Sequence, residues 1–262
     1  CSGMIEFGDS RFHCWKKDGH GWLNMIDAIE QSCDVYLYEL AKRVGIKRIG
    51  EMAARFGFGE AFNFGLPGEN RGLIPTPAWK RKTFGQAWHA GETLITSIGQ
   101  GFILCTPLQL AVMTSRLVNG GRPVLPRLMK NERAEIQKRK SLQLSPQHLH
   151  TVLKGMDKVV NGSQGTARKV VDQSMKFQFG GKSGSVQVKR ISLDERESGK
   201  LKNKDRPWRE RDHAMFVAFA PLKSPRYVVS VVVEHGGGGS TMAAPIARDI
   251  LAEALRLNPS KL

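Results

Sequence analysis

The chain has 262 residues, of which 40% are hydrophobic and 24% charged, so its length and composition fit one sizeable globular domain or two small ones. No apolar run approaches the roughly 20 residues of a membrane-spanning helix, and the opening Cys1-Ser2-Gly3 resembles neither a signal peptide nor an initiator sequence, so we expect a piece of a longer protein. The net charge of +16 favours anionic partners, but zinc-finger, RNP and Gly-rich phosphate-loop patterns are absent, so no nucleic-acid partner is expected.

The first half of the sequence predicts helices that follow an irregular start. Residues 1–23 combine scattered glycines with mixed polar side chains, and we expect no regular structure there. Helical spacing of apolar residues then covers 24–44, as two helices that meet near Ser32, and 46–56 as a further helix. Residues 57–92 are rich in Gly and Pro, which indicates a long folded loop.

The second half predicts two more helices and then a change to strands. Pro follows a hydroxyl residue at Thr106 and Ser145, which is a usual helix start. These helices end at glycine-containing turns near Val118 and Asn161. β-branched and aromatic runs then predict antiparallel strands, followed by a closing helix. The three strands and the helix cover 179–188, 214–220, 227–234 and 244–257. The charged run 189–211 is expected to be a solvated, mobile loop.

Three motifs stand in a fixed order along the chain. They are Ser32-Cys33-Asp34, Ile98-Gly99-Gln100-Gly101 followed by Thr106-Pro107-Leu108-Gln109, and Lys182-Ser183-Gly184-Ser185. Each is weak alone, but the ordered set resembles that of the penicillin-binding proteins. The resemblance extends over nearly the whole chain and is closest to the elongation-specific monofunctional transpeptidases, the penicillin-binding protein 2 group. The matching segments are FHCWKKDGHG (12–21), SCDVYLYELA (32–41), IGQG…TPLQLA (98–111), NGSQGTA (161–167), GGKSGSVQV (180–188) and RDHAMFVAFAP (211–221).

The resemblance implies roles for the first motif. Ser32 would relay a proton between the catalytic lysine and the leaving amine. Asp34, in place of the usual Asn, would orient that lysine and accept a hydrogen bond from the substrate amide. Taken singly, Ser32 could instead interrupt or cap a helix, with Asp34 as a first-turn acid.

The strand motif suits the anchoring of a peptide carboxylate. Lys182 would supply positive field, and the hydroxyls of Ser183 and Ser185 would bind the terminal carboxylate of a D-Ala-D-Ala peptide. The Ser185 N–H would form half of an oxyanion hole, and Gly184 would let the substrate lie as an added strand along this edge. Alone, this motif would indicate only an exposed strand end.

The sequence departs from the family pattern in two ways. Ser185 stands where Thr is more usual, which keeps the hydroxyl. No Ser is followed three residues later by Lys, so we expect the nucleophile of the S-x-x-K motif to precede Cys1, and the chain by itself should not acylate. The functional prediction also requires Ser32–Asp34 and Lys182–Ser185 to line one groove.

The resemblance implies the fold of serine penicillin-recognising enzymes, an α+β type with an antiparallel sheet flanked by helices and a helical subdomain. Residues 1–262 would be the C-terminal part of the transpeptidase domain, with the nucleophile, the pedestal and the membrane anchor outside the chain. The whole protein would cross-link peptidoglycan stem peptides at the periplasmic face of the inner membrane, beside a SEDS-family glycan polymerase and elongation-complex proteins, and β-lactams would inhibit it. A D,D-carboxypeptidase or serine β-lactamase on the same fold, or a non-catalytic cell-wall scaffold module, are the alternatives.

Acyl transfer needs no cofactor, but the first 33 residues carry a candidate structural zinc site. Three of the four cysteines lie here, and with one histidine they give the spacing C-x12-C-x5-H-x12-C. The candidate ligands are Cys1, Cys14, His20 and Cys33, and some elongation-class relatives resemble this chain in carrying ligand-type residues at matching places. Asp9, His13 or an upstream residue could replace Cys1, and a disulfide such as Cys1–Cys14 is the rival hypothesis. Cys105 is expected to be a buried core thiol.

Overall fold

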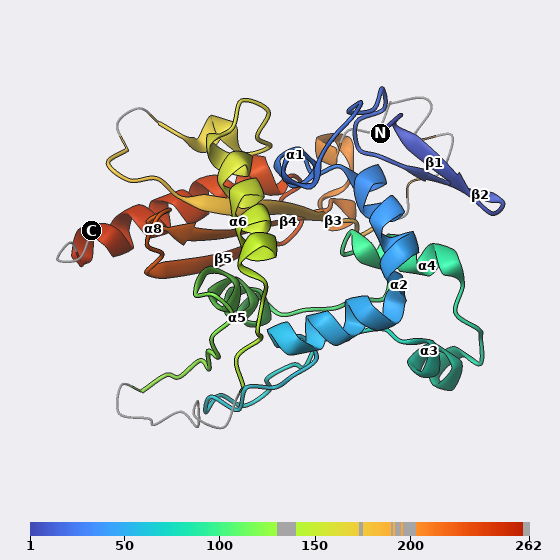
Figure 1. Ribbon diagram of the computed structural model, residues 1–262, viewed down its shortest axis with the longest axis horizontal. Helices are drawn as coiled ribbons and strands as arrows, with labels where there is room; N and C mark the ends of the chain where they lie inside the picture. The colour runs from blue at the N-terminus through green and yellow to red at the C-terminus, as the bar shows by residue number, and fades with distance from the viewer. Residues whose placement is uncertain (130–139, 173–174, 190, 192–194, 196–202, 259–262) are drawn as a thin grey trace. The chain divides into compact units, whose positions relative to one another are not determined.

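The computed structural model describes residues 1–129, 140–172, 175–189, 191, 195 and 203–258. The chain divides into two compact units, Cys1–Leu153 and Lys154–Leu262, and each is described by itself (Figure 1). Among the helices in the described ranges, none combines the length and the apolar character required to cross a bilayer.

The first unit opens with a β-hairpin in a segment that the sequence predicts to be irregular. β1 (Met4–Phe7) and β2 (Ser10–His13) pair antiparallel around the two-residue turn Gly8-Asp9. Gly8 has a φ of 58°, which the tightest hairpin turns require and glycine adopts without steric cost. The expectation of an irregular start was therefore wrong for this segment, because strands of four residues are too short to show a clear alternation.

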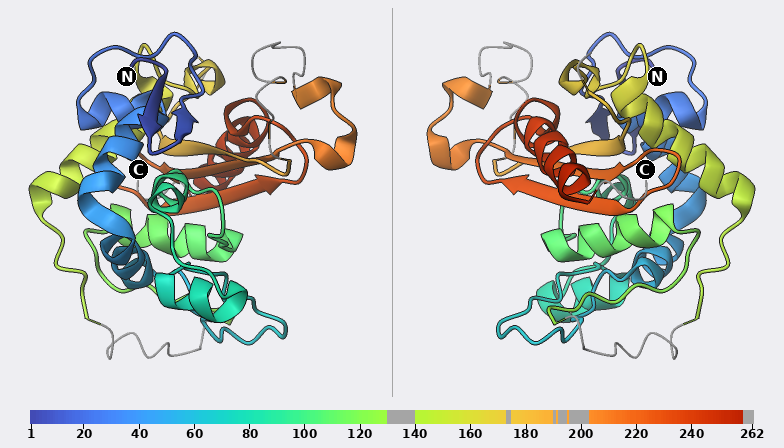
Figure 2. Two further views of the ribbon diagram at one scale, coloured as in Figure 1. Left: turned by 90° about the vertical axis from the view of Figure 1, so that its right-hand side faces the viewer. Right: turned by 90° about the vertical axis from the view of Figure 1, so that its left-hand side faces the viewer.

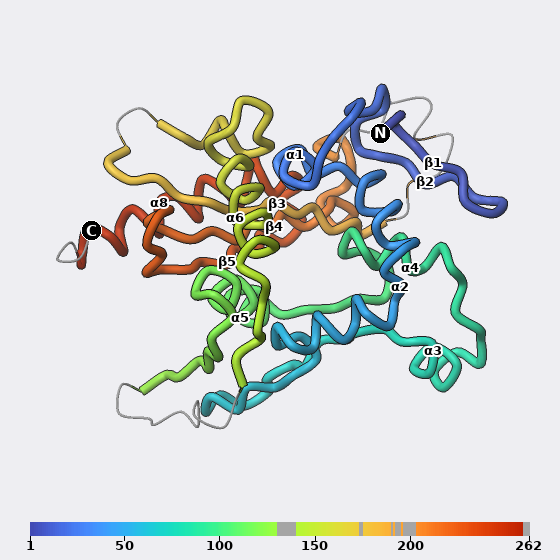
Figure 3. Tube along the Cα trace, in the orientation of Figure 1, coloured from blue at the N-terminus to red at the C-terminus, as the bar shows by residue number. Residues whose placement is uncertain are grey.

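Two helices meet at the predicted junction. α1 (Met25–Glu30) follows Asn24, whose side chain accepts a backbone N–H of the first turn, and α2 (Asp34–Phe56) comes next. α2 is kinked at Gly45, where φ is 77° and ψ is 156°, so the two helices predicted on either side of this residue form one element (Figure 3). It ends at Gly57, whose left-handed conformation is a common helix stop.

The segment 57–92, expected to be a long loop, contains one helix and the first turn of a second. α3 (Pro77–Phe84) is capped by Thr76, and α4 (Ala90–Ser97) follows it. The buried ammonium of Lys80 lies 2.5 Å from a carboxylate oxygen of Glu92, and this ion pair joins the two helices. The loop prediction was wrong here because Gly and Pro flank short helices at their ends, where both residues are compatible with helix.

The next two helices have the predicted bounds, α5 (Pro107–Val118) and α6 (Pro146–Asn161). Thr106 forms a capping box with Gln109 at the start of α5. α6 begins in the first unit and ends in the second. Cys105, expected in the core, is exposed. The chain approaches the cap of α5 along the surface, where the preceding residue is exposed as well.

The second unit is an antiparallel sheet with a helix packed against it. The strands, in their order across the sheet, are β3 (Gly180–Val186), β4 (His213–Ala220) and β5 (Tyr227–Val233). α8 (Ala244–Leu257) packs on β4 and β5 (Figure 2) and buries Ala247 and Leu251. The antiparallel strands and the closing helix confirm the prediction for this part of the chain.

Short helical turns connect these elements. They are η2 (Arg168–Val170), η3 (Asn203–Asp205), η4 (Trp208–Glu210) and the π-turn η5 (Gly239–Ala243). The expectation of a mobile loop over 189–211 falls largely outside the described residues. Its described C-terminal part carries η3 and η4 and leads directly into β4.

Candidate active site and cysteine cluster

Ser32 lies at a tight turn between α1 and α2. Its φ is 52°, in the left-handed region that residues other than glycine rarely occupy. The N–H of Cys33 donates to the carbonyl of Ala28 at 2.9 Å, and Cys33 is the N-cap residue of α2. Ser32 therefore interrupts the helical path without capping α2, and strained backbone of this kind is common at functional sites.

Asp34 begins α2 and holds the preceding segment against the Ser32 turn. Its Oδ2 accepts the backbone N–H of Trp15 at 2.9 Å. The indole Nε1–H of Trp15 lies 3.0 Å from each of the carbonyl oxygens of Gln31 and Ser32. The carboxylate also lies at the positive end of the helix dipole. Asp34 thus has a clear structural role, and its predicted role toward a catalytic lysine stays a prediction.

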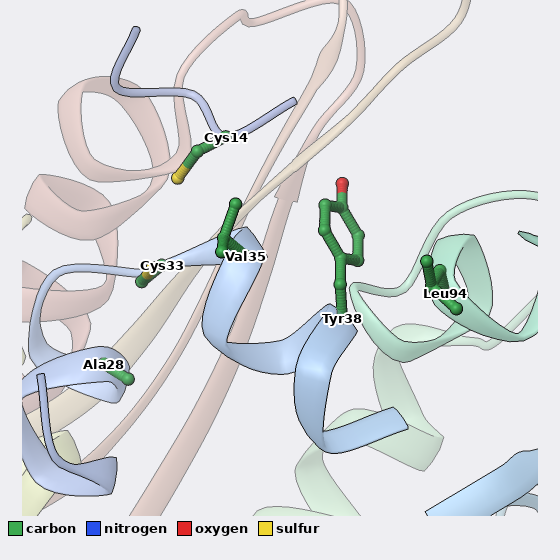
Figure 4. Packing of buried hydrophobic residues seen from close by; sticks show 6 residues of the cluster. All are labelled: Cys14, Ala28, Cys33, Val35, Tyr38 and Leu94. Atoms are coloured by element: carbon green, nitrogen blue, oxygen red, sulfur yellow. The ribbon is translucent and has the colours of Figure 1, made fainter. Parts of the chain in front are cut away.

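The four predicted metal ligands lie together in the first unit. One ligand atom from each lies within 4.8 Å of the ligand atoms of the others, and Sγ of Cys14 is 3.5 Å from Nδ1 of His20. Cys14 and Cys33 are buried beside the start of α2 (Figure 4). They pack with the core residues Ala28, Val35, Tyr38 and Leu94. All four cysteines of the chain are free thiols in this structure.

The backbone around Cys1 brings these ligands together. The Cys1 carbonyl accepts the N–H of His20 at 3.1 Å and that of Gly21 at 3.0 Å. A Cβ atom on Gly19 would lie only 2.2 Å from the same carbonyl oxygen, so the close approach requires glycine. Backbone hydrogen bonds therefore hold Cys1 beside His20 independently of the ligand side chains.

The two buried cysteines of the cluster have pKa values that are shifted in opposite directions. A hydrogen bond with Cys33 lowers the pKa of Cys14 well below that of an ordinary thiol, and the same bond, together with burial, raises the pKa of Cys33. Burial lowers the pKa of His20, which favours the neutral imidazole. Its Nε2 is buried without a hydrogen-bond partner among the described residues. A thiolate and a neutral imidazole are the forms that bind zinc.

In the second unit, Lys182–Ser185 lies on β3, which pairs with β4 and is an edge strand of the described sheet. Ser183 and Ser185 are two residues apart, so their side chains leave the same face of the strand. Ser183 is half-buried and Ser185 is exposed, while Nζ of Lys182 donates to the Ser183 carbonyl at 2.9 Å. A Cβ atom on Gly184 would make only an ordinary contact, 3.5 Å from Cβ of Met215.

Two residues outside the predicted site contact this motif. Oγ1 of Thr166 lies 3.2 Å from Oγ of Ser183, and the N–H of Gly239 donates to Oγ of Ser185 at 3.4 Å. The signal for Thr166 was its place in the matching segment NGSQGTA, and that for Gly239 was the run of four glycines after β5. Ser32 and Asp34 belong to the first unit and Lys182–Ser185 to the second. The single groove that they were expected to line stays a prediction.

The sequence and the structure are both similar to proteins of one family. The sequence matches the Penicillin binding protein transpeptidase domain over residues 1–252. It is 38% identical over 256 residues to the peptidoglycan D,D-transpeptidase MrdA of Haemophilus influenzae. The structure is similar to Pseudomonas aeruginosa PBP2, solved in complex with WCK 5153, with a TM-score of 0.81 at 36% identity. It is also similar to Helicobacter pylori PBP2, solved in complex with MreC, with a TM-score of 0.83 at 33% identity.

These matches cover nearly all of this chain but only part of each relative. The match to the Haemophilus influenzae protein spans 95% of this chain and 39% of that protein. The matches to the Pseudomonas aeruginosa and Helicobacter pylori structures each span 97% of this chain, and 54% and 44% of those chains.

Proposed function

Because the chain belongs to the penicillin-binding protein transpeptidase family and has its fold, we propose that it is the C-terminal part of a D,D-transpeptidase domain of the penicillin-binding protein 2 group. The whole protein would cross-link peptidoglycan stem peptides during cell elongation. The observation that carries this proposal is the Lys182–Ser185 motif on β3, an edge strand of the sheet formed by the described residues, which presents two hydroxyls and an ammonium.

The chemistry of β3 fits a peptide that ends in D-Ala-D-Ala. An extended peptide would add as a further strand at the β3 side of the described sheet through backbone hydrogen bonds, while Ser183 and Ser185 donate to its terminal carboxylate. Lys182 lowers the electrostatic cost of the negative charge. The packing within this unit does not itself require glycine at position 184, which supports close approach of a substrate as the reason for Gly184.

The nucleophile is proposed to lie in the part of the whole protein that precedes Cys1. No Ser in this chain has a Lys three residues later. Ser32 would relay the proton from the nucleophile side of the site to the leaving amine, and its strained backbone supports that role. Asp34 would accept a hydrogen bond from the substrate amide. The chain alone, without the nucleophile, should not acylate.

We also propose a structural zinc ion at the cysteine cluster. The ligand atoms of Cys1, Cys14, His20 and Cys33 gather within 4.8 Å of one another, and three sulfurs with one imidazole are a common structural zinc set. A disulfide between two of the cysteines would give no bonding partner to the third thiol or to the buried His20 nitrogen, so the geometry favours a metal ion over a disulfide. When bound, zinc would supply cross-linking of the Ser32 turn to the N-terminal hairpin and no acyl-transfer chemistry.

The setting of the whole protein follows from the same proposal. It would work at the periplasmic face of the inner membrane, held by an anchor outside this chain, beside a SEDS-family glycan polymerase. The Helicobacter pylori relative was solved in complex with MreC, which supports an elongation-complex partner here as well. β-lactams, which mimic D-Ala-D-Ala, would acylate the protein.

Labelling with a fluorescent penicillin tests the proposal. The whole protein should be labelled covalently, and residues 1–262 alone should not. A whole protein that resists labelling would favour a non-catalytic scaffold module. Covalent labelling of Ser32 or Ser183 by the penicillin would show that the roles proposed for these residues are wrong. Product analysis with an amine acceptor against water then separates a transpeptidase, which transfers to the amine, from a carboxypeptidase or β-lactamase, which transfers to water.

A further inference from the structure

The hydroxyl of Thr166 is held beside a carboxylate-anchoring hydroxyl of β3. Oγ1 of Thr166 lies 3.2 Å from Oγ of Ser183, at a spacing suited to a hydrogen bond in which either oxygen can donate. A hydroxyl has one proton to donate and two lone pairs to accept. If Ser183 donates its proton to a substrate carboxylate, its oxygen is therefore free to accept the proton of Thr166.

The turn that carries Thr166 is fixed on both sides. The N–H of Ala167 donates to the carbonyl of Val159 at 2.9 Å, which ties the turn to the last turn of α6. A Cβ atom on Gly165 would lie 2.4 Å from the Lys158 carbonyl oxygen, so only glycine allows this approach. The same end of α6 is tied to the entry of β3, because the side-chain amide of Asn161 donates to the Phe179 carbonyl at 3.0 Å.

The second hydroxyl of the motif has a donor of its own. The backbone N–H of Gly239 donates to Oγ of Ser185 at 3.4 Å. The two hydroxyls of β3 thus have hydrogen-bond partners on two separate segments, the turn after α6 and the start of η5. A hydroxyl that already accepts a hydrogen bond is a better donor, because the bonds in such a chain polarise one another.

We infer that Thr166 is a positioning residue, which donates to Ser183 and so aims the Ser183 proton at the carboxylate of the bound substrate. This inference rests on the proposed function and adds a residue to it. Thr166 itself does not touch the substrate. Its contribution should therefore depend on two things, the hydroxyl at Ser183 and the negative charge on the ligand.

The test is acylation of the whole protein by benzylpenicillin and by its methyl ester, which lacks the carboxylate charge. Thr166→Val keeps the shape of the side chain and removes the hydroxyl, and Thr166→Ser keeps the hydroxyl. We expect Thr166→Val to lower the second-order acylation constant for benzylpenicillin by about 10-fold, because a hydrogen bond that supports a charged group is lost. The constant for the ester should change by less than about 2-fold, and Thr166→Ser should restore the constant for benzylpenicillin.

Two further measurements make the result specific. In a Ser183→Ala background, Thr166→Val should have no additional effect, because the residue acts through that hydroxyl. Ser163→Ala removes an exposed hydroxyl from the same turn and should leave both constants unchanged. The ester reports on folding in every variant, so a general loss of structure would lower both constants together.

The outcomes separate the inference from the function on which it rests. If neither compound acylates the wild-type protein, the proposed function and the inference about Thr166 are both wrong. If the wild-type protein is acylated but Thr166→Val lowers the acylation constant for the ester as much as that for benzylpenicillin, the inference alone is wrong. The inference also fails if Thr166→Ser is as impaired as Thr166→Val, or if the loss persists in full without the Ser183 hydroxyl.

Discussion

The backbone N–H of Trp15 donates to the Oδ2 of Asp34 at 2.9 Å and so ties the N-terminal segment to the first turn of α2. The indole of the same residue bonds to the carbonyls on the other side of the turn, at Gln31 and Ser32. One residue therefore braces the strained turn from two directions. The turn with the proposed proton relay and the segment with the cysteine cluster are consequently parts of one local structure.

We expect an amide at position 34 to preserve the hydrogen bond with the Trp15 N–H, whereas truncation to alanine should lose it. Asp34→Asn keeps an oxygen that can accept the Trp15 N–H, and we expect unchanged penicillin acylation of the whole protein. Asp34→Ala leaves that N–H without its acceptor and should destabilise the segment locally by about 1–2 kcal/mol. Limited proteolysis between the hairpin and α1 measures this effect, with the exposed Glu51→Gln as control. Equal protection of the Ala and Asn variants would contradict the bracing role.

Metal removal tests the cysteine cluster. Protein purified without chelator should contain about one zinc per chain, because structural sites of this ligand set hold one ion. Protein from which a chelator has removed the metal should have a lower melting temperature than untreated protein, since an ion that binds only the folded state stabilises it. His20→Ala and Cys33→Ser should lose the metal, and Cys105→Ser, at an exposed cysteine outside the cluster, should keep it. Absence of zinc from the wild-type protein would exclude the site.

The elements with standard start and stop signals were predictable from the sequence. α5 and α6 begin at Pro after a hydroxyl residue, and β4 and β5 are apolar runs bounded by Pro and Gly, so their bounds were predicted within a residue or two. The β1–β2 hairpin, α3 and α4 were not, because elements of four to eight residues show too few repeats of their period.

The sequence supplies the candidate residues of the site but not their contacts. Motif order selects Ser32, Asp34 and Lys182–Ser185 as candidates, and their roles stay predictions, whereas cysteine clustering selects four residues that the structure does bring together. The partners Trp15, Thr166 and Gly239 depend on tertiary approach of segments distant in sequence. A hydrogen bond such as that from Gly239 to Ser185 spans 54 residues, and no local pattern encodes it.

Asp212 should make the stability of the second unit depend on pH. Burial raises the pKa of its carboxyl above the ordinary value of 3.8, although the guanidinium of Arg206, 3.8 Å away, and the adjacent His213 oppose the rise. Between the ordinary and the raised pKa, the folded state binds more protons than the unfolded state. The free energy of unfolding should therefore fall as pH rises through that window, starting near pH 4.

Asp212→Asn removes this titration. The stability of the wild type relative to the variant should decrease as pH rises from about 4 through the raised pKa, and then stay constant. Hydrogen exchange of the β4 amides, corrected for the intrinsic pH dependence of exchange, measures the local free energy of opening. The backbone hydrogen bonds of Asp212 to Asn203 and Gly237 remain in the variant, so the comparison isolates the carboxyl. A relative stability that increases over this window would show that the sign is wrong.

Two glycines beside Ser183 and Ser185, the hydroxyls proposed to bind substrate, should respond differently to alanine. A Cβ atom on Gly239 would lie 2.2 Å from the Met215 carbonyl oxygen and 2.3 Å from that of Gly184, so the start of η5 must shift in Gly239→Ala. The shift removes the hydrogen bond to Ser185. We expect a loss of about 1–3 kcal/mol in stability, typical of overpacking, together with slower penicillin acylation.

Gly184→Ala is the matched comparison, because its Cβ atom would make only an ordinary contact, at 3.5 Å, with Cβ of Met215. This variant should keep the melting temperature of the wild type and still lose penicillin acylation. Gly184 lies on the strand along which the ligand is proposed to bind, and the added methyl group would project on the Lys182 face of β3, where close approach of the ligand would be hindered. Thermal melting and acylation rates measured on the whole protein separate the two effects. Full acylation of Gly184→Ala would mean that the ligand does not approach this part of β3, and the proposed substrate position would then be wrong.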